Sequence, residues 1–242
     1  MNLVVDIGNS FMKVAVVEQD QILLLRRYQS LEEFAWCDIG NEYPAIKRAI
    51  VASTAMPTGE VAALLRGCGL WVLEMTSQTP IPIGNSYLTP QTLGVDRLAA
   101  AVGAVGQVGG DCLIVDFGSA ITIDLVEGGV FRGGNISPGV AMRFRALHDY
   151  TKRLPLCSAT DEDLELGRTT MQAIEQGVMQ GITNEIEGYI SYFYAQNVKL
   201  SLIFTGGDAK YFVKRIKNAI FANYDLVICG LNRILEYNAK AE

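Results

Sequence analysis

An aspartate–glycine turn between two apolar segments occurs twice in this chain, and the repeat constrains the fold more than any other feature. Residues 3–14 read LVVDIGNSFMKV, and residues 113–120 read LIVDFGSA, followed by the apolar segment Ile121 to Val126. Apolar runs bounded by Gly, Asn and Ser predict two strands and a tight turn. One such hairpin in each half predicts a duplicated, two-lobed domain, with the two Asp-Gly turns facing each other across a cleft.

The residues of the first turn suit an anion together with a hard cation. Gly8 has no Cβ, so the backbone can bend there and a ligand can come close. The turn N–H groups, the Asn9 amide, the Ser10 hydroxyl and the Lys13 ammonium can converge on a phosphate. Asp6 can hold a metal ion or its bound water. An edge hairpin with a polar tip explains the same residues and stays open as the alternative.

Composition limits the classes of function. The chain has 242 residues, of which 50% are hydrophobic and 19% charged, which is typical of an ordered globular protein with one large domain or two small lobes. The net charge of −6 and the pI near 4.9 argue against a nucleic-acid-binding surface. The sequence contains no apolar run long enough to predict a membrane span, and the N-terminus lacks the pattern of a secretory signal. We therefore expect a cytoplasmic protein with no nucleic-acid or membrane partner.

The cysteines and the single histidine do not predict a metal centre. The cysteines are odd in number and scattered, and no C-x-x-C occurs, which favours reduced thiols over a disulfide framework or a zinc site. His148 is predicted near the end of a helix, where a surface or capping role is expected. The cysteines are Cys37, Cys68, Cys112, Cys157 and Cys229.

The rest of the chain alternates between strand and helix patterns, which is typical of an α/β protein. Further predicted strands are 22–26, 48–53, 70–73, 130–132, 199–204 and 226–229. Predicted helices are 31–36, 58–67, 94–102, 140–147, 169–196, 211–220 and 231–237. The segments 79–90 and 133–139 are predicted as loops, and Gly109-Gly110 as the boundary between lobes 1–110 and 111–242.

Other glycine patterns narrow the choice of nucleotide-binding motif. Gly103, Gly106 and Gly109 precede a strand instead of following one, so a dinucleotide-binding loop is not predicted, and no P-loop sequence occurs. The glycine-rich segment 133–139 comes just before a predicted helix. It is predicted either as an anion or ligand site or as a tight connection.

Asp96 and Arg97 fall in the first turn of the predicted helix 94–102. A carboxylate is favoured there by the helix dipole. From helix physics alone, a capping aspartate beside a solvated arginine is the preferred interpretation.

The motifs, taken in order, resemble the acetate kinase/sugar kinase/Hsp70/actin superfamily and, more closely, the type III pantothenate kinase family. The resemblance spans nearly the whole chain and implies an α/β, two-lobed, duplicated ribonuclease H-like (actin-like ATPase) fold with mixed sheets flanked by helices. Its motifs are 6–10 with Lys13, 94–97, 116–120 with Thr122 and Asp124, 133–139, 151–155, 169–170 and 205–208.

The resemblance also implies a reaction, which is the ATP-dependent phosphorylation of pantothenate to 4'-phosphopantothenate, the first step of coenzyme A biosynthesis. Asp96 is then the general base, a reversal of the capping interpretation. The residues that the resemblance implies as ATP contacts are Asp6, Gly8, Asn9, Ser10, Lys13, Ser119, Thr205, Gly206 and Gly207. Contacts with pantothenate fall to Tyr87, Gly94, Val95, Arg97 and Thr170.

The same resemblance implies magnesium with ATP at Asp6, a monovalent cation (K⁺ or NH₄⁺) at Asp116, and a homodimer. Ser119 stands where the family usually has threonine, so the hydroxyl is kept. Asp124 matches a family position without a firm role. The alternatives are another small-molecule kinase of the superfamily and a non-catalytic transcription accessory protein, against which the intact acidic residues and Lys13 argue.

Overall fold

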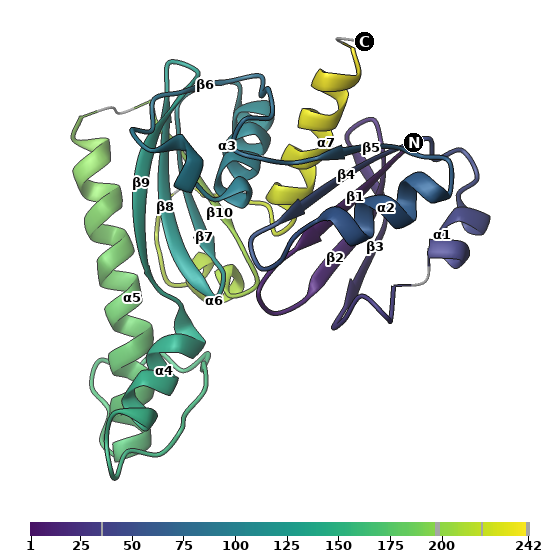
Figure 1. Cartoon of the computed structure of the whole chain (residues 1–242). Helices are drawn as coiled ribbons and strands as arrows, with labels where there is room; N and C mark the ends of the chain where they lie inside the picture. Colours follow the sequence, from purple (N-terminus) through teal and green to yellow (C-terminus); the bar gives the residue numbers. More distant parts are fainter. Residues whose placement is uncertain (35, 197–198, 219, 241–242) are drawn as a thin grey trace. The chain divides into compact units, whose positions relative to one another are not determined.

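The computed structural model describes residues 1–34, 36–196, 199–218 and 220–240 and contains two compact units (Figure 1). The first unit comprises Met1–Gly109, Gly129–Arg132 and Asp225–Glu242, and the second comprises Gly110–Gly128 and Gly133–Tyr224. The division into lobes 1–110 and 111–242 stays a prediction, as does the cleft between the two turns.

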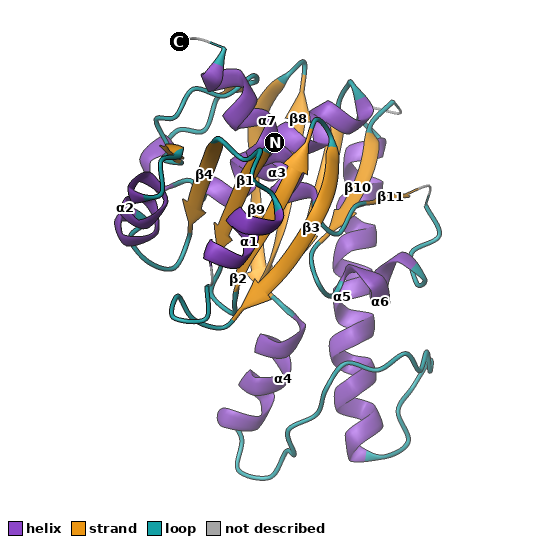
Figure 2. Cartoon of the chain, turned by 90° about the vertical axis from the view of Figure 1, so that its right-hand side faces the viewer, coloured by secondary structure: helices purple, strands orange, loops and turns teal. Residues whose placement is uncertain are grey.

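The first unit is built on a five-stranded mixed sheet in the order β3-β2-β1-β4-β5. Figure 2 labels β1, β2, β3 and β4 of this sheet. The first hairpin forms as predicted, because β1 and β2 pair antiparallel, and β3 continues the meander on the far side of β2. On the other side, β4 and β5 add in parallel. The strands are β1 (Asn2–Ile7), β2 (Met12–Glu18), β3 (Gln21–Tyr28), β4 (Arg48–Ser53) and β5 (Trp71–Glu74).

Side chains of β1 alternate between two covered faces, as the period of two requires. Leu3, Val5 and Ile7 pack in one cluster with residues of α1 (Trp36–Glu42) and α2 (Gly59–Gly67). Asn2, on the opposite face, donates hydrogen bonds to Asn232 and Glu236 of α7 (Leu226–Ala239). Asp6 has the parity of Asn2 and therefore lies on the face of β1 that α7 covers.

Helix α7 packs against α3 (Val95–Val108), and Figure 1 shows the two helices side by side. Small residues make this close packing possible. A Cβ on Gly230 would overlap the Ala99 carbonyl oxygen, and a Cβ on Gly103 would contact the backbone at Leu226. The helix that begins beside Asp96 is thereby fixed on the first unit.

The second unit repeats the hairpin in a second mixed sheet. β7 and β8 pair antiparallel, and β10 lies in parallel between β7 and β11. Leu113, Val115 and Phe117 face a core that they share with the helices. The strands are β7 (Cys112–Phe117), β8 (Ala120–Glu127), β9 (Val130–Pro138), β10 (Ser201–Thr205) and β11 (Ile220–Ala222).

Three helices cover that core: α4 (Val140–Asp149), α5 (Thr170–Tyr194) and α6 (Ala209–Val213). The helix predicted at 169–196 is confirmed as α5: Met171 near its start is exposed, but apolar side chains at steps of four along the rest of the helix are buried. Those side chains are Ile174, Val178, Ile182, Ile186 and Ile190.

Several predicted elements are wrong. The apolar run 226–229 is the first turn of α7 and not a strand, because a short apolar run fits a buried helix equally well. The glycine-rich segment 133–139 is not a loop, because residues 133–138 are the last six residues of β9. Gly134 lies so close to β8 that a Cβ would overlap the Ile123 carbonyl oxygen.

Two predicted helices are misplaced. The one predicted at 211–220 is the shorter α6, and Ile220 begins β11, while Ala219 lies outside the described residues. The helix predicted at 31–36 begins only at Trp36 as α1, and Ala35 is likewise outside the described residues. Across the described part of the chain, no helix has the length and apolar character needed to cross a membrane.

Candidate functional site

The first turn places a carboxylate and an ammonium on neighbouring strands. In the β1–β2 register Asp6 is opposite Lys13, and the Gly8 N–H closes the turn by donating to the Phe11 carbonyl oxygen at 3.2 Å. Asn9 and Ser10 are exposed at the tip. The structure therefore brings together the first group of predicted residues, although the Gly8 N–H is already engaged within the turn.

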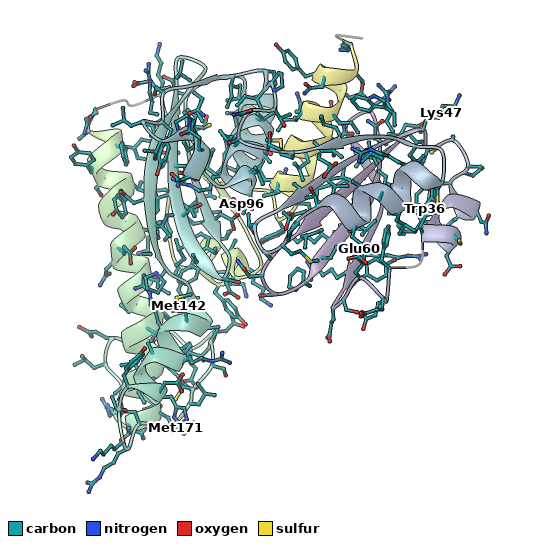
Figure 3. All side chains as sticks on the ribbon, viewed as in Figure 1. Trp36, Lys47, Glu60, Asp96, Met142 and Met171 are labelled. Atoms are coloured by element: carbon teal, nitrogen blue, oxygen red, sulfur yellow. The ribbon has the colours of Figure 1, made fainter. Side chains whose placement is uncertain are left out.

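Asp96 lies in the first turn of α3, which begins at Val95 after the N-cap residue Gly94 (Figure 3). Its Oδ1 accepts a hydrogen bond from the Arg97 N–H at 2.9 Å. A Cβ on Gly94 would overlap that oxygen, so glycine leaves the space into which the carboxylate folds. The motif 94–97 is thus one local unit that fixes an acidic group at a helix N-terminus.

The negative charge of Asp96 acts on Asp6, so the two carboxylates lie near one another. Burial raises the pKa of Asp6 to about 6; Lys13 opposes the shift and the negative charge of Asp96 adds to it. Burial also raises the pKa of Asp96, opposed by the Arg97 N–H and the Arg97 charge. Two half-buried carboxylates whose anionic forms are disfavoured form a place where a cation would be stabilised.

This pair of acids fits magnesium held together with a nucleotide. Mg²⁺ in proteins usually takes one or two carboxylates and completes its coordination with water and substrate phosphates. No cluster of three or more His, Cys, Asp or Glu able to hold a metal occurs in the described ranges. Asp6, the predicted magnesium ligand, is one of these two carboxylates.

Arg97 is nearly buried and lies on two aromatic rings. Its Cζ is 5.7 Å from the ring centroid of Tyr87 and 5.7 Å from that of Phe131. Tyr87 and Arg97 are predicted substrate contacts, and the structure brings them together. Sequence reasoning missed Phe131, because an apolar residue in a predicted strand, 130–132, reads as core.

The second turn surrounds its aspartate with hydroxyl and backbone groups. Asp116 is opposite Thr122 on β8 and opposite Thr205 on β10. Gly206 has φ +89°, and a Cβ there would overlap Asp116 Oδ1. The residue after β10 must therefore be a glycine, because any side chain there would collide with Asp116. Asp116, Thr205 and Gly206 are therefore brought together as predicted, and Gly207 is the next residue.

The end of β9 also lies against the second turn. The Gly139 N–H donates to the Ser119 carbonyl oxygen at 3.2 Å, and a Cβ on Gly139 would overlap the carbonyl oxygens of Gly118 and Ser119. The motif 133–139 is thus next to Ser119, although as a strand end and not as a loop. Thr170, the remaining predicted substrate contact, is exposed at the start of α5, where Thr169 caps the helix.

Comparison with known proteins gives a consistent result. The sequence profile of the family described as type III pantothenate kinase matches residues 2–192. A type III pantothenate kinase from Phocaeicola vulgatus is 40% identical over 242 residues, covering 99% of this chain and 100% of that protein.

Two solved structures have a similar fold. A Baf family protein from Campylobacter jejuni gives a TM-score of 0.63 at 24% identity, covering 98% of this chain and 99% of that one. A protein from Sinorhizobium meliloti assigned as a 2-dehydro-3-deoxygalactonokinase gives 0.58 at 13% identity, with coverage of 98% and 99%. The predicted α/β fold of the actin-like ATPase and sugar kinase type is confirmed. The chain belongs to the type III pantothenate kinase family.

Proposed function

We propose that this protein transfers the γ-phosphoryl group of ATP to the primary hydroxyl of pantothenate, with Asp96 as the general base. The product is 4'-phosphopantothenate, and the reaction is the first step of coenzyme A biosynthesis. Family membership supports the reaction. The observation that supports the role of Asp96 is its place at the start of α3, near Asp6 and next to Arg97.

Phosphoryl transfer depends on positioning and on charge stabilisation more than on covalent chemistry. Asp96 accepts a hydrogen bond from the acceptor hydroxyl, orients it for attack, and takes its proton as the new P–O bond forms. The bond between the γ-phosphorus and the β,γ-bridging oxygen breaks in the same transfer, and ADP is the leaving group. Burial raises the pKa of Asp96, which makes the carboxylate a stronger base than an exposed aspartate. The hydrogen bond from the Arg97 N–H limits the rise and holds the carboxylate in place.

The first turn is assigned to the phosphates. Lys13 contributes positive charge beside Asp6, and the Asn9 amide and the Ser10 hydroxyl contribute hydrogen bonds. Asp6 would hold Mg²⁺, which neutralises negative charge on the phosphate oxygens when it is bound. Ser119, Thr205, Gly206 and Gly207 are assigned to the nucleotide in the second unit, and Asp116 to a monovalent cation.

The test of this proposal is a coupled ADP assay on the purified protein with ATP, Mg²⁺ and pantothenate. The expected result is turnover that needs pantothenate and rises when potassium is added. A panel of sugars and small acids separates this activity from that of another kinase of the superfamily. Absence of turnover with every acceptor, while the folded protein still binds ATP, would support the alternative of a non-catalytic accessory protein.

A homodimer is part of the proposal, and an exposed apolar surface on the second unit supports it. The surface carries large side chains on α4, on the segment that follows it and at the start of α5; Figure 3 labels two of them, Met142 and Met171. Thr170 is adjacent to Met171 in the chain. The exposed apolar residues are Met142, Tyr150, Leu156, Leu166 and Met171.

Sedimentation of the wild type and of Met171→Glu tests the dimer. A monomeric variant beside a dimeric wild type is the expected result, and a wild type that sediments as a monomer at micromolar concentration would contradict it. The proposed cytoplasmic location is supported by the five cysteines, none of which forms a disulfide among the described residues.

A further inference from the structure

Arg97 lies on two aromatic rings, those of Tyr87 and Phe131, and the proposed function gives a role only to Tyr87. The guanidinium carbon is 5.7 Å from each ring centroid, and the two centroids are 6.1 Å apart. These three distances form a nearly equilateral triangle. The rings therefore form a single platform on which the guanidinium lies, and they do not enclose it from opposite sides.

A short strand pairing builds the platform. β6 (Gly84–Asn85) pairs in parallel with Val130 and Phe131 at the start of β9, all within the first unit. The Gly84 N–H donates to the Gly129 carbonyl oxygen at 2.9 Å. A Cβ on Gly84 would lie 2.9 Å from a Val130 methyl group, so the close approach needs glycine.

Ser86 then fastens the segment at the position of Phe131. Its N–H and its hydroxyl each donate to the Phe131 carbonyl oxygen at 3.0 Å. Tyr87 follows directly in the chain, so its ring is brought against that of Phe131, with an interplanar angle of 54°. Phe131 is 0% exposed and Arg97 is 6% exposed, so this part of the platform is shielded from water.

We propose that Phe131 is a positioning residue that sets substrate selectivity by orienting Arg97 toward the carboxylate of pantothenate. A guanidinium is planar, so its positively charged face can stack on an aromatic ring while its N–H groups donate hydrogen bonds in the plane of the group. Both interactions can therefore be made at once. A carboxylate is the group that a fixed guanidinium recognises best, through two parallel N–H···O bonds. This inference rests on the proposed function, in which Arg97 contacts pantothenate.

The alternative is that Phe131 only fills the core. A side chain with that role would, when shortened, lower the stability of the protein and affect all kinetic constants through the amount of active enzyme. A residue that acts through Arg97 changes recognition of one part of one substrate. The two roles therefore differ in which kinetic constant moves.

Phe131→Leu is the test, with Phe34→Leu as the matched control. Phe34 is a buried phenylalanine of the first unit that packs edge-on against Tyr28 and is remote in sequence from every assigned residue. For Phe131→Leu we expect the KM for pantothenate to rise about 3- to 10-fold, the range that loss of one cation–π contact predicts. The KM for ATP is expected to stay within about twofold for both variants, which is the scatter of such assays and well below one decade.

A neutral analogue of pantothenate, with an alcohol in place of the carboxylate, provides the second readout. Phe131→Leu is expected to leave the KM for this analogue unchanged, so the preference for the acid falls. In an Arg97→Leu background, Phe131→Leu is expected to add no further change. An equal rise in KM for acid and analogue, or a full additional rise in the Arg97→Leu background, would overturn the inference.

The outcomes separate this inference from the proposed function. A wild type that does not phosphorylate pantothenate overturns the function itself. A wild type that does, with Phe131→Leu kinetically equal to Phe34→Leu, overturns only the role of Phe131. If Phe131→Leu does not fold, the milder Phe131→Met also removes the ring while filling the space with a flexible apolar side chain, and it carries the same expected rise in the KM for pantothenate and the same unchanged KM for the neutral analogue.

Discussion

The two Asp-Gly turns have the same backbone design and different neighbours. Each aspartate is the second-to-last residue of the strand that opens its hairpin, and alternate side chains of that strand enter a core. Asp6, however, has Lys13 opposite on the antiparallel strand and Ala52 on the parallel one. Asp116 has threonines at both of the corresponding places. The two hairpins therefore share one backbone arrangement, and the residues on the adjacent strands determine the chemical surroundings of each aspartate.

The difference indicates a division of labour. The first turn is ionic, with an ammonium and a second carboxylate, Asp96, acting on Asp6. This combination suits a polyphosphate with a divalent cation. The second turn surrounds one carboxylate with hydroxyl groups and the backbone of Gly206. One carboxylate with neutral oxygen atoms around it suits a monovalent cation and the sugar or base of a nucleotide.

The largest effect is expected from Asp96→Asn, because the carboxylate that accepts the proton is lost while its shape is kept. We expect kcat to fall by about 10²- to 10⁴-fold, the usual contribution of a general base, with ATP binding retained. Steady-state kinetics and ATP titration by calorimetry measure the two quantities.

Asp208→Asn is the matched control for that variant. Asp208 is also a half-buried aspartate at a helix start, next to the second turn, and burial raises its pKa as well. A change of only a few-fold in kcat is expected there. Comparable losses at both positions would show that the ionic first turn holds no special base.

A stability effect follows from the raised pKa of Asp6. Because this carboxyl has a pKa of about 6 in the folded protein and 3.8 as its ordinary value, the native state binds the proton more tightly than the unfolded state. The free energy of unfolding therefore falls as pH rises between these values. At about 1.4 kcal/mol per pKa unit, the fall from this group is at most about 3 kcal/mol.

Asp6→Asn is expected to remove that dependence and so to stabilise the metal-free protein at neutral pH while reducing activity. Urea unfolding at about pH 4.5 and about pH 7.5, compared with wild type, measures the difference. An equal change in the free energy of unfolding at both pH values would mean that Asp6 is not buried beside a second acid in solution.

The positions of the hairpins could be predicted from the sequence because the alternation of core and non-core side chains along a strand involves only neighbouring residues. Leu3, Val5 and Ile7 alternate with Asp6, and a tight turn sets Asp6 opposite Lys13. The approach of Asp96 depends instead on α3 packing against α7 on one face of the sheet. That packing is fixed by contacts such as Asn2 with Asn232, 230 residues apart in sequence, which no local pattern contains.

The missed features share this long-range origin. Phe131 acquires its significance only when β6 pairs with β9 and brings Tyr87 beside it. The run 226–229 is helical because α7 packs on α3, although the apolar pattern is equally compatible with a strand. The glycines of 133–139 predict a loop by composition, and only their closeness to β8 and to Ser119 shows why glycine is needed.

A smaller effect is expected from Gly206→Ala, which tests the close packing of the second turn. The new methyl group would overlap Asp116 Oδ1, and φ +89° disfavours any residue with a Cβ. We expect the free energy of unfolding to fall by about 1–3 kcal/mol and stimulation by potassium to be lost. Unfolding curves and a potassium titration of turnover are the measurements.

Gly8→Ala provides the comparison at the first turn, where the nearest atom to a new Cβ, the Phe11 carbonyl oxygen, is at 3.4 Å. Its free energy of unfolding is expected to change by less than about 1 kcal/mol, because the contact is ordinary and a surface turn tolerates it. Potassium stimulation that persists in Gly206→Ala would remove the assignment of the second turn to the cation.

The smallest effect separates the two positions opposite the aspartates. Lys13→Met keeps the length of the side chain and removes its charge, so the KM for ATP with magnesium is expected to rise about 3- to 10-fold, as for loss of a partly exposed charge contact worth about 1 kcal/mol. Because Lys13 lowers the pKa of Asp6, its loss also moves the acid limb of ATP binding to higher pH. Thr122→Val, opposite Asp116, removes a hydroxyl at the same register position and is expected to leave the KM for ATP within about twofold. Equal rises in that KM for both variants would mean that the two turns share one chemistry, and the distinction between an ionic and a hydroxyl-lined turn would then have to be abandoned.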